Sequence, residues 1–181
     1  MVKFNFAQAL LNWHKDNGRH DLPWQQPRTP YRVWVSEIML QQTQVATVVN
    51  YFENFLRAFP TLRKLAQAPN ETVMQYWAGL GYYSRARNLH KSAQICLEKY
   101  HAELPVQFEQ LIELPGIGRS TAGAILSQAH GKAFAILDGN VKRVLARYHA
   151  INGEIKSSSV TKQLWQHAES HLTKNNLANY T

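Results

Sequence analysis

The stretch Leu111-Ile112-Glu113-Leu114-Pro115-Gly116-Ile117-Gly118-Arg119-Ser120-Thr121-Ala122-Gly123-Ala124 joins two segments of helical period through Gly116 and Gly118. Glycine permits a positive φ and lets the backbone approach a ligand where a Cβ would otherwise stand. The unpaired N–H groups at the start of the second helix then point outward and can donate to a phosphate oxygen. A plain connection between two helices is the alternative that Gly-x-Gly alone leaves open. The complete Leu-Pro-Gly-Ile-Gly-Arg pattern, followed by small residues, favours a hairpin that binds the DNA backbone without reading its sequence.

Helical periods continue on both sides of this hairpin. Thr29 and Pro30 are typical of the N-cap and first residue of a helix, and Gly18 is typical of a helix end. No segment alternates apolar and polar residues long enough for a strand. The sequence therefore predicts an all-α fold, with helices at about 4–17, from Pro30 onward, and at 45–59, 61–68, 70–78, 84–100, 106–113, 119–130, 140–150 and 158–173.

Composition and charge narrow the class of protein. The 181 residues are 45% hydrophobic and 18% charged, as in a folded domain, and 20 Lys and Arg face 12 Asp and Glu for a net charge of +8. Such a charge indicates a polyanionic partner, nucleic acid first, while a basic protein without that partner stays an alternative. The single cysteine, Cys96, excludes an internal disulfide and a cysteine-based metal cluster within this chain. No apolar run reaches the roughly 18 residues of a membrane span, so we expect a reducing, aqueous compartment such as the cytoplasm.

A carboxylate precedes a further helix in Leu137-Asp138-Gly139-Asn140. Asp138 can cap that helix by accepting its first N–H groups. The functional alternative is a carboxylate held at a helix N-terminus, facing a cleft and kept ionised by those hydrogen bonds. Lys142, Arg143 and Arg147 on the same helix either supply charge to phosphates or are ordinary solvated residues.

The hairpin and Leu-Asp-Gly-Asn together resemble the helix-hairpin-helix DNA glycosylase superfamily typified by endonuclease III. Three more stretches, Leu22-Pro23-Trp24, VSEIMLQQTQV at 35–45 and GLGYYSRARNL at 79–89, are similar to its adenine DNA glycosylase family. That family removes adenine mispaired with 8-oxoguanine or guanine from double-stranded DNA. The resemblance covers nearly the whole chain and implies one glycosylase domain of two helical lobes flanking a DNA-binding cleft. One lobe is expected at about 25–135, with the helix-hairpin-helix at 111–130, and the other from about 1–24 and 136–181.

The resemblance also implies catalytic roles that suit the chemistry. Breaking an N-glycosidic bond needs an acid to protonate the leaving base and a carboxylate to stabilise the cationic sugar. Glu37 matches the acid, Asp138 the stabilising carboxylate, and Asn140 a supporting hydrogen-bonding residue. Trp34, Val35, Ile38 and Leu40 give Glu37 an apolar setting that favours its protonated form if it is buried. Without the motif, Glu37 is simply a solvated carboxylate on a helix.

Recognition residues follow from the same resemblance, because a base must leave the duplex before it can react. The residues that enter the base stack match Gln41, Gln42 and Tyr82, and the positions near 8-oxoguanine match Thr43 and Leu80. The adenine pocket matches Leu22 and Trp24. Further DNA contacts match Gly116, Gly118, Ser120 and Lys142. Ordinary core packing is the alternative for Trp24, Trp34, Tyr82 and Tyr83.

Ser120 separates the subfamilies. Members that also cut the strand have a lysine there, which attacks the sugar as a Schiff-base nucleophile. Serine cannot form an imine, so it predicts a monofunctional enzyme. The resemblance further implies a monomer whose partner is double-stranded DNA with an adenine mispair, and not a membrane. The family's [4Fe–4S] cluster is expected to have its ligand cysteines beyond residue 181, with no cofactor bound by this chain. A thymine or uracil mismatch glycosylase, against which the Glu37 block argues, and a non-catalytic helix-hairpin-helix module are the other two hypotheses.

Overall fold

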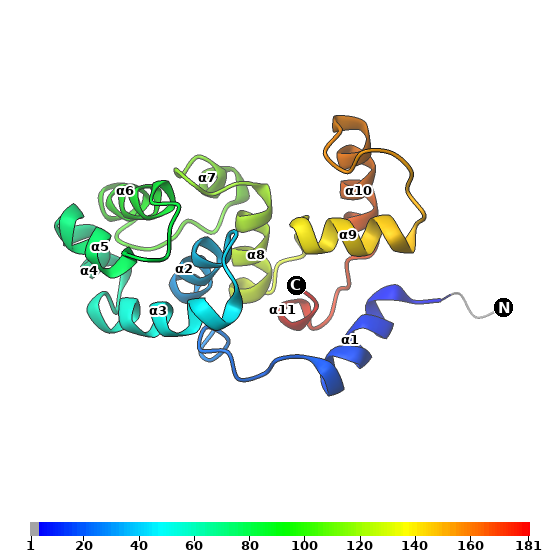
Figure 1. Ribbon diagram of the computed structural model, residues 1–181, viewed down its shortest axis with the longest axis horizontal. Helices are drawn as coiled ribbons and strands as arrows, with labels where there is room; N and C mark the ends of the chain where they lie inside the picture. Colours follow the sequence, from blue (N-terminus) through cyan, green and yellow to red (C-terminus); the bar gives the residue numbers. More distant parts are fainter. Residues whose placement is uncertain (1–3) are drawn as a thin grey trace. The chain divides into compact units, whose positions relative to one another are not determined.

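A computed structural model describes residues 4–181, and within that range the chain forms eleven α-helices and no strand (Figure 1). The prediction of an all-α fold is confirmed. None of the helices in this range combines the length and apolar character that a membrane span requires. The helices are α1 (Phe6–Asn17), α2 (Pro30–Leu40), α3 (Val45–Ala58), α4 (Leu62–Gln67), α5 (Asn70–Trp77), α6 (Ser84–Lys99), α7 (Phe108–Ile112), α8 (Arg119–His130), α9 (Gly139–Tyr148), α10 (Ser158–Ser170) and α11 (Leu177–Tyr180).

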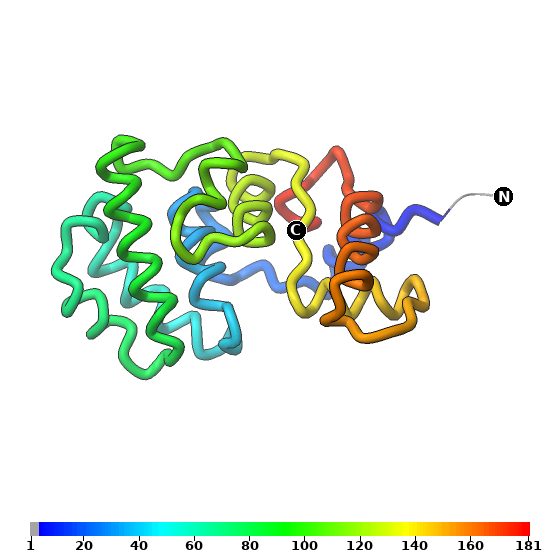
Figure 2. The backbone as a smooth tube through the Cα atoms, turned by 90° about the horizontal axis from the view of Figure 1, so that it is seen from above, coloured from blue at the N-terminus to red at the C-terminus, as the bar shows by residue number. Residues whose placement is uncertain are grey.

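The chain divides into two compact units, which we describe separately. The first, His20–Ala122, holds α2 to α7 and the first turn of α8. The second combines residues 4–19 with Gly123–Thr181, so that the N-terminal helix α1 (blue in Figure 2) belongs to the same unit as the C-terminal helices α9, α10 and α11. The expected lobes had their boundaries at about 24 and 135. The two compact units divide after Arg19 and inside α8, and the lobe boundaries stay a prediction.

The first unit is built around α2, which begins as its sequence predicts. Thr29 caps the helix by accepting a hydrogen bond from the Arg32 N–H at 3.3 Å, and Pro30 follows at the first helical position. Helix α2 packs against α3 and α6, and α6 packs in turn against α4 and α5. The core of this first unit consists of fully buried large side chains, among them Trp34, Met39, Phe52, Phe55, Leu65, Trp77 and Leu89.

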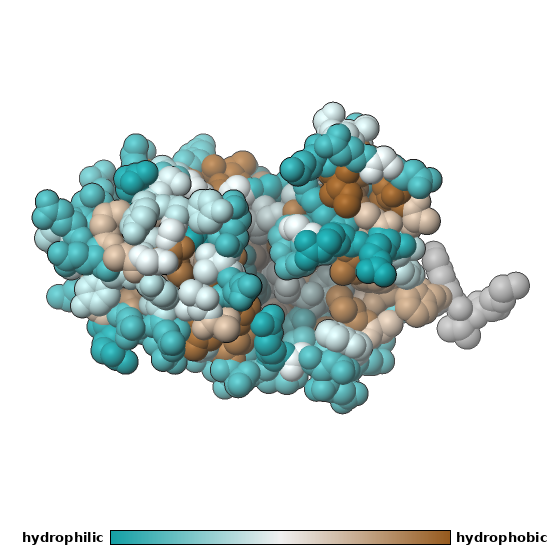
Figure 3. Space-filling view, in the orientation of Figure 1, coloured by the Kyte–Doolittle hydropathy of each residue, from teal (hydrophilic) through white to brown (hydrophobic). Residues whose placement is uncertain are grey.

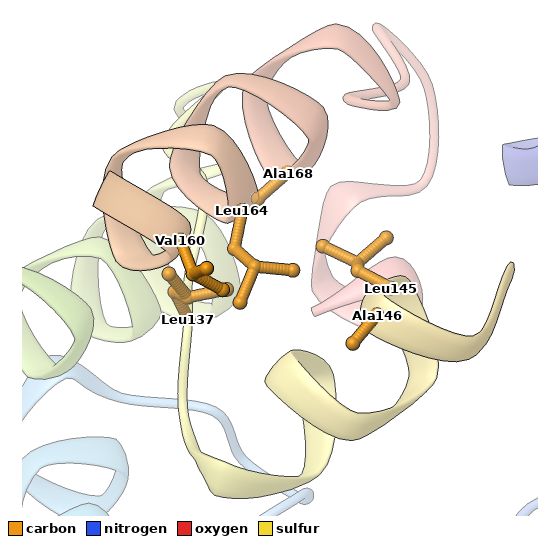
Figure 4. Packing of buried hydrophobic residues seen from close by; sticks show 6 residues of the cluster. All are labelled: Leu137, Leu145, Ala146, Val160, Leu164 and Ala168. Carbon is orange, nitrogen blue, oxygen red and sulfur yellow. The ribbon is translucent and has the colours of Figure 1, made fainter. Parts of the chain in front are cut away.

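The second unit buries a smaller apolar cluster between α9, α10 and the segment before α9. Figure 4 shows Leu164 of α10 between the Leu137–Val160 pair and Leu145, and Leu164 is completely buried. Apolar side chains also reach the surface around α9 and α10 (Figure 3), where Val144 is 52% exposed. The cluster comprises Leu137, Leu145, Ala146, Val160, Leu164 and Ala168.

Two local features differ from the sequence prediction. Gly18 does end α1, but in an extended conformation and not the left-handed one usual for a terminal glycine. A Cβ at Gly18 would lie 2.5 Å from the side chain and carbonyl of His14, so close approach is the reason for glycine there. Helix α11 has no counterpart in the prediction, because its four residues are too few for a helical period.

Candidate active site and nucleic-acid interface

The predicted base-stack residues meet at one pocket of the first unit. Gln41 and Gln42 follow the end of α2, and Tyr82 lies in the turn between α5 and α6. All three are exposed, Tyr82 by 58%, although an aromatic side chain usually packs inside. This argues against the core-packing alternative for Tyr82. The residues around the pocket are Ile38, Gln41, Gln42, Tyr82, Ser84, Arg85, Asn88 and Gly116.

The hairpin at Gly116 borders the same pocket. Gly116 has a φ of +81°, and a Cβ there would lie 2.9 Å from the Cβ of Asn88 on α6. The carbonyl before it, of Pro115, accepts a hydrogen bond from the Ser92 hydroxyl of α6 at 2.8 Å. Gly118, in contrast, faces open space. The hairpin is therefore held against α6 at Gly116 and leaves the backbone at Gly118 open to a ligand.

Ser120 follows in the first turn of α8 and is half-buried. Its hydroxyl lies at the start of a helix, where backbone N–H groups lack intrahelical partners. Ser120 thus lies beside the hairpin, and its contact with a phosphate stays a prediction.

Glu37 is the exception on a buried stretch of α2. Glu37 is half-buried, whereas all the remaining residues between 33 and 39 are buried. Its neighbours along α2 are thus buried, and its role as the acid stays a prediction.

Leu22 and Trp24 lie in the loop before α2. Trp24 is 5% exposed and packs edge-on against Phe52 of α3, with 5.4 Å between the ring centroids. Leu22 is half-buried, and its N–H donates to the Gln25 side chain at 3.2 Å. The packing alternative thus describes Trp24, and the fully buried Trp34 as well.

Thr43 and Leu80 share one neighbour, Arg85, that the sequence analysis left without a role. The Arg85 guanidinium donates to the Thr43 hydroxyl at 3.2 Å and to the Leu80 carbonyl at 3.3 Å. Burial lowers the pKa of Arg85, and the nearby Tyr82 phenol acts in the opposite direction. A signal was present in the sequence: Arg85 lies at helical spacing with Leu89, Ala93 and Cys96, which form the buried face of α6.

Asp138 and Asn140 belong to the second unit, at the start of α9. One Asp138 oxygen accepts from the Val141 N–H at 2.8 Å, and the other from the Asn140 side-chain amide at 3.3 Å. Asn140 in turn accepts from the Arg143 guanidinium. Asp138 therefore caps the helix and is exposed as well, while its catalytic role stays a prediction. Lys142, one turn further, is half-buried.

An iron–sulfur cluster does not fit the residues present. Cys96, the only cysteine in the sequence, is buried on α6, where burial raises its pKa to about 12. A cluster needs several thiolates. Residues 4–181 also contain no group of three or more His, Cys, Asp or Glu side chains that could hold a metal ion.

Comparison with known proteins decides the family. Residues 35–170 match the model of the HhH-GPD superfamily base excision DNA repair proteins. The chain belongs to this superfamily. Among solved structures, that of a thermostable thymine-DNA glycosylase superposes with a TM-score of 0.86 at 25% identity, covering 97% of this chain and 80% of that one. An endonuclease III–DNA complex superposes with a TM-score of 0.78 at 21% identity, covering 96% and 78%.

Two curated HhH-GPD relatives are more similar in sequence. The adenine DNA glycosylase of Buchnera aphidicola (subsp. Acyrthosiphon pisum) is 52% identical over 170 residues, which is 94% of this chain and 49% of the relative. The human adenine DNA glycosylase is 48% identical over 169 residues, which is 88% of this chain and 31% of the relative. The chain thus spans at most about half the length of these relatives.

Proposed function

We propose that this chain carries the catalytic region of an adenine DNA glycosylase, which hydrolyses the N-glycosidic bond of adenine mispaired with 8-oxoguanine or guanine. The observation that carries the proposal is the 52% identity to the Buchnera adenine DNA glycosylase across 94% of the chain. The thymine-DNA glycosylase of nearly the same fold is 25% identical. Because one fold supports several base specificities, the sequence similarity outweighs the structural one.

Glu37 is the proposed general acid. Its half-buried carboxyl on an otherwise buried stretch of α2 donates a proton to N7 of the extruded adenine. The C1′–N9 bond then breaks, its electron pair leaves with the protonated base, and the sugar becomes oxocarbenium-like. Water adds to C1′ and gives its proton to the Glu37 carboxylate, which restores the acid for the next turnover.

Asp138 is the proposed electrostatic partner of the cationic sugar. The Val141 N–H and the Asn140 amide fix both of its oxygens, so the carboxylate is held in place before the charge develops. Ser120 at the start of α8 cannot form an imine with the abasic sugar, and so the proposed enzyme is monofunctional.

Single-turnover release of adenine from a duplex with one 8-oxoguanine·adenine pair tests the proposal. The parent chain is expected to release adenine, and Glu37→Gln to do so slower by roughly 10²–10⁴, because the amide keeps the shape without the acid. Glu53→Gln, which makes the same change at an exposed site on α3, is the matched control and is expected to behave like the parent.

Two outcomes would contradict the proposal. Release of thymine or uracil from a mismatched duplex, with adenine left in place, would favour the mismatch glycosylase. Binding of duplex DNA without release of any base would favour a non-catalytic helix-hairpin-helix module.

A further inference from the structure

Arg85 is a buried arginine that joins two loops. It lies in the first turn of α6, and only 7% of it is exposed. Its two terminal nitrogens donate to six oxygens, all of them near the end of α2 or in the turn before α6. The six acceptors are the carbonyls of Ile38, Met39, Gln41, Leu80 and Gly81 and the hydroxyl of Thr43.

These loops both contain a strained residue. Gln42 has a φ of +58° and Tyr82 a φ of +48°, in the left-handed region that side chains other than glycine rarely adopt. Such a residue persists only where its surroundings hold it in place. Two of the six acceptors, the Gln41 carbonyl and the Thr43 hydroxyl, come from the residues on either side of Gln42. Two more, from Leu80 and Gly81, directly precede Tyr82.

The guanidinium also lies over two aromatic rings, that of Trp77 at the end of α5 and that of Tyr82 in the turn before α6. Its carbon lies 5.4 Å from the centroid of the Trp77 ring and 5.4 Å from that of Tyr82. The indole N–H of Trp77 donates to the Gly81 carbonyl at 3.1 Å. A lysine at this position would keep the charge, but it has three donors on a compact ammonium and no plane to stack on a ring.

We propose that Arg85 is a positioning residue that holds Gln42 and Tyr82 in the conformation needed to enter the DNA base stack. This inference rests on the proposed function for its substrate. Arg85 acts through the two side chains that it holds, which are exposed beside the pocket, while its own guanidinium is buried. Its removal should therefore impair opening of the duplex more than binding of the duplex.

Arg85→Lys, compared with Arg87→Lys, tests the inference. Both changes keep the charge and lie on α6, but Arg87 is exposed. The probe is a duplex with 2-aminopurine next to the 8-oxoguanine·adenine pair, because its fluorescence rises on unstacking. For Arg85→Lys we expect a much smaller fluorescence rise and adenine release slower by about tenfold to 10²-fold, as for a catalytic geometry displaced by about 1 Å. Binding to a fully matched duplex should stay close to that of the parent, and Arg87→Lys should match the parent in all three measurements.

The fluorescence separates this inference from the proposed function. If the parent opens the duplex but releases no adenine, the proposed function fails and Arg85 is still tested by the fluorescence. Duplex opening at the parent level by a folded Arg85→Lys variant would overturn the inference. A loss of matched-duplex binding as large as the loss of duplex opening would also overturn it, because it indicates a general structural role for Arg85. If circular dichroism shows Arg85→Lys to be unfolded, Thr43→Val is tested in its place, because it removes only one of the six acceptors. A partial loss of duplex opening in Thr43→Val supports the inference, and parent-like opening overturns it.

Discussion

Asp138 has two roles at the start of α9 that a substitution can separate. It caps the helix through the Val141 N–H, and it offers an exposed carboxylate. Asparagine caps helices as well as aspartate does but carries no charge. Asp138→Asn should therefore keep the thermal stability of the parent and slow the release of adenine, because a neutral amide stabilises a cationic sugar poorly.

Asp138→Ala completes this experiment, since it also removes the cap and should cost about 1 kcal/mol of stability. The two variants are compared by thermal unfolding and by single-turnover kinetics, with the exposed Asp21→Asn as the charge control. Parent-like kinetics for Asp138→Asn would show that Asp138 is a cap and nothing more.

At the scale of elements, the two hairpin glycines have different tasks. Gly116 needs its positive φ and its contact with Asn88, whereas Gly118 has open space around its Cα. Gly116→Ala should lower the stability of the chain by roughly 1–2 kcal/mol, because an L residue is strained in the left-handed region. Gly118→Ala should leave stability unchanged. It should weaken binding to matched and mismatched duplexes alike, since we expect the hairpin to contact phosphates only. A loss confined to mismatched DNA would contradict this role.

Three histidines lie close together where α9 packs against α10. His149 directly follows α9, His167 lies in α10, and His171 directly follows α10. The Nε2 atoms of His149 and His171 are 2.8 Å apart, and the ring of His149 stacks on that of His167 at 3.6 Å. Burial, and then the charges of His167 and His171, lower the pKa of His149. Burial, and then His167, lower the pKa of His171. Protonation of His149 and His171 therefore opposes folding.

This cluster predicts a stability that depends on pH. Because the folded pKa values are lowered, the unfolded chain binds more protons, and stability rises with pH. The contribution should be complete above the ordinary histidine pKa of about 6.5 and should fall as the pH drops below it. Thermal unfolding at pH 5 and pH 7.5 measures this. His149→Gln should reduce the difference between the two melting temperatures, whereas the exposed His20→Gln should not; an unchanged difference in His149→Gln would contradict the assignment.

At the scale of the whole molecule, the net charge of +8 predicts DNA binding that weakens steeply with salt. The logarithm of the binding constant should fall linearly with that of the salt concentration, by about 0.9 for each phosphate contacted. If Lys142 contacts a phosphate, Lys142→Ala lowers this slope by about 0.9 and Lys142→Arg leaves it unchanged. Lys99→Ala, an equal loss of charge at the end of α6, is the control. Equal slopes for the parent and Lys142→Ala would remove Lys142 from the interface.

What the sequence by itself determined are the features that depend on neighbours in the chain. The Thr29-Pro30 start of α2, the bounds of α8 and the cap by Asp138 follow from local hydrogen bonding and helical period. Only the tertiary structure decided which surfaces those helices cover. It buried Trp24 against Phe52, placed the division between units inside α8, and brought Arg85 to carbonyls more than forty residues away. The physical reason is that burial and long-range hydrogen bonds depend on which helices pack together. The helical period of the sequence predicts only that one face of each helix is covered, not what covers it.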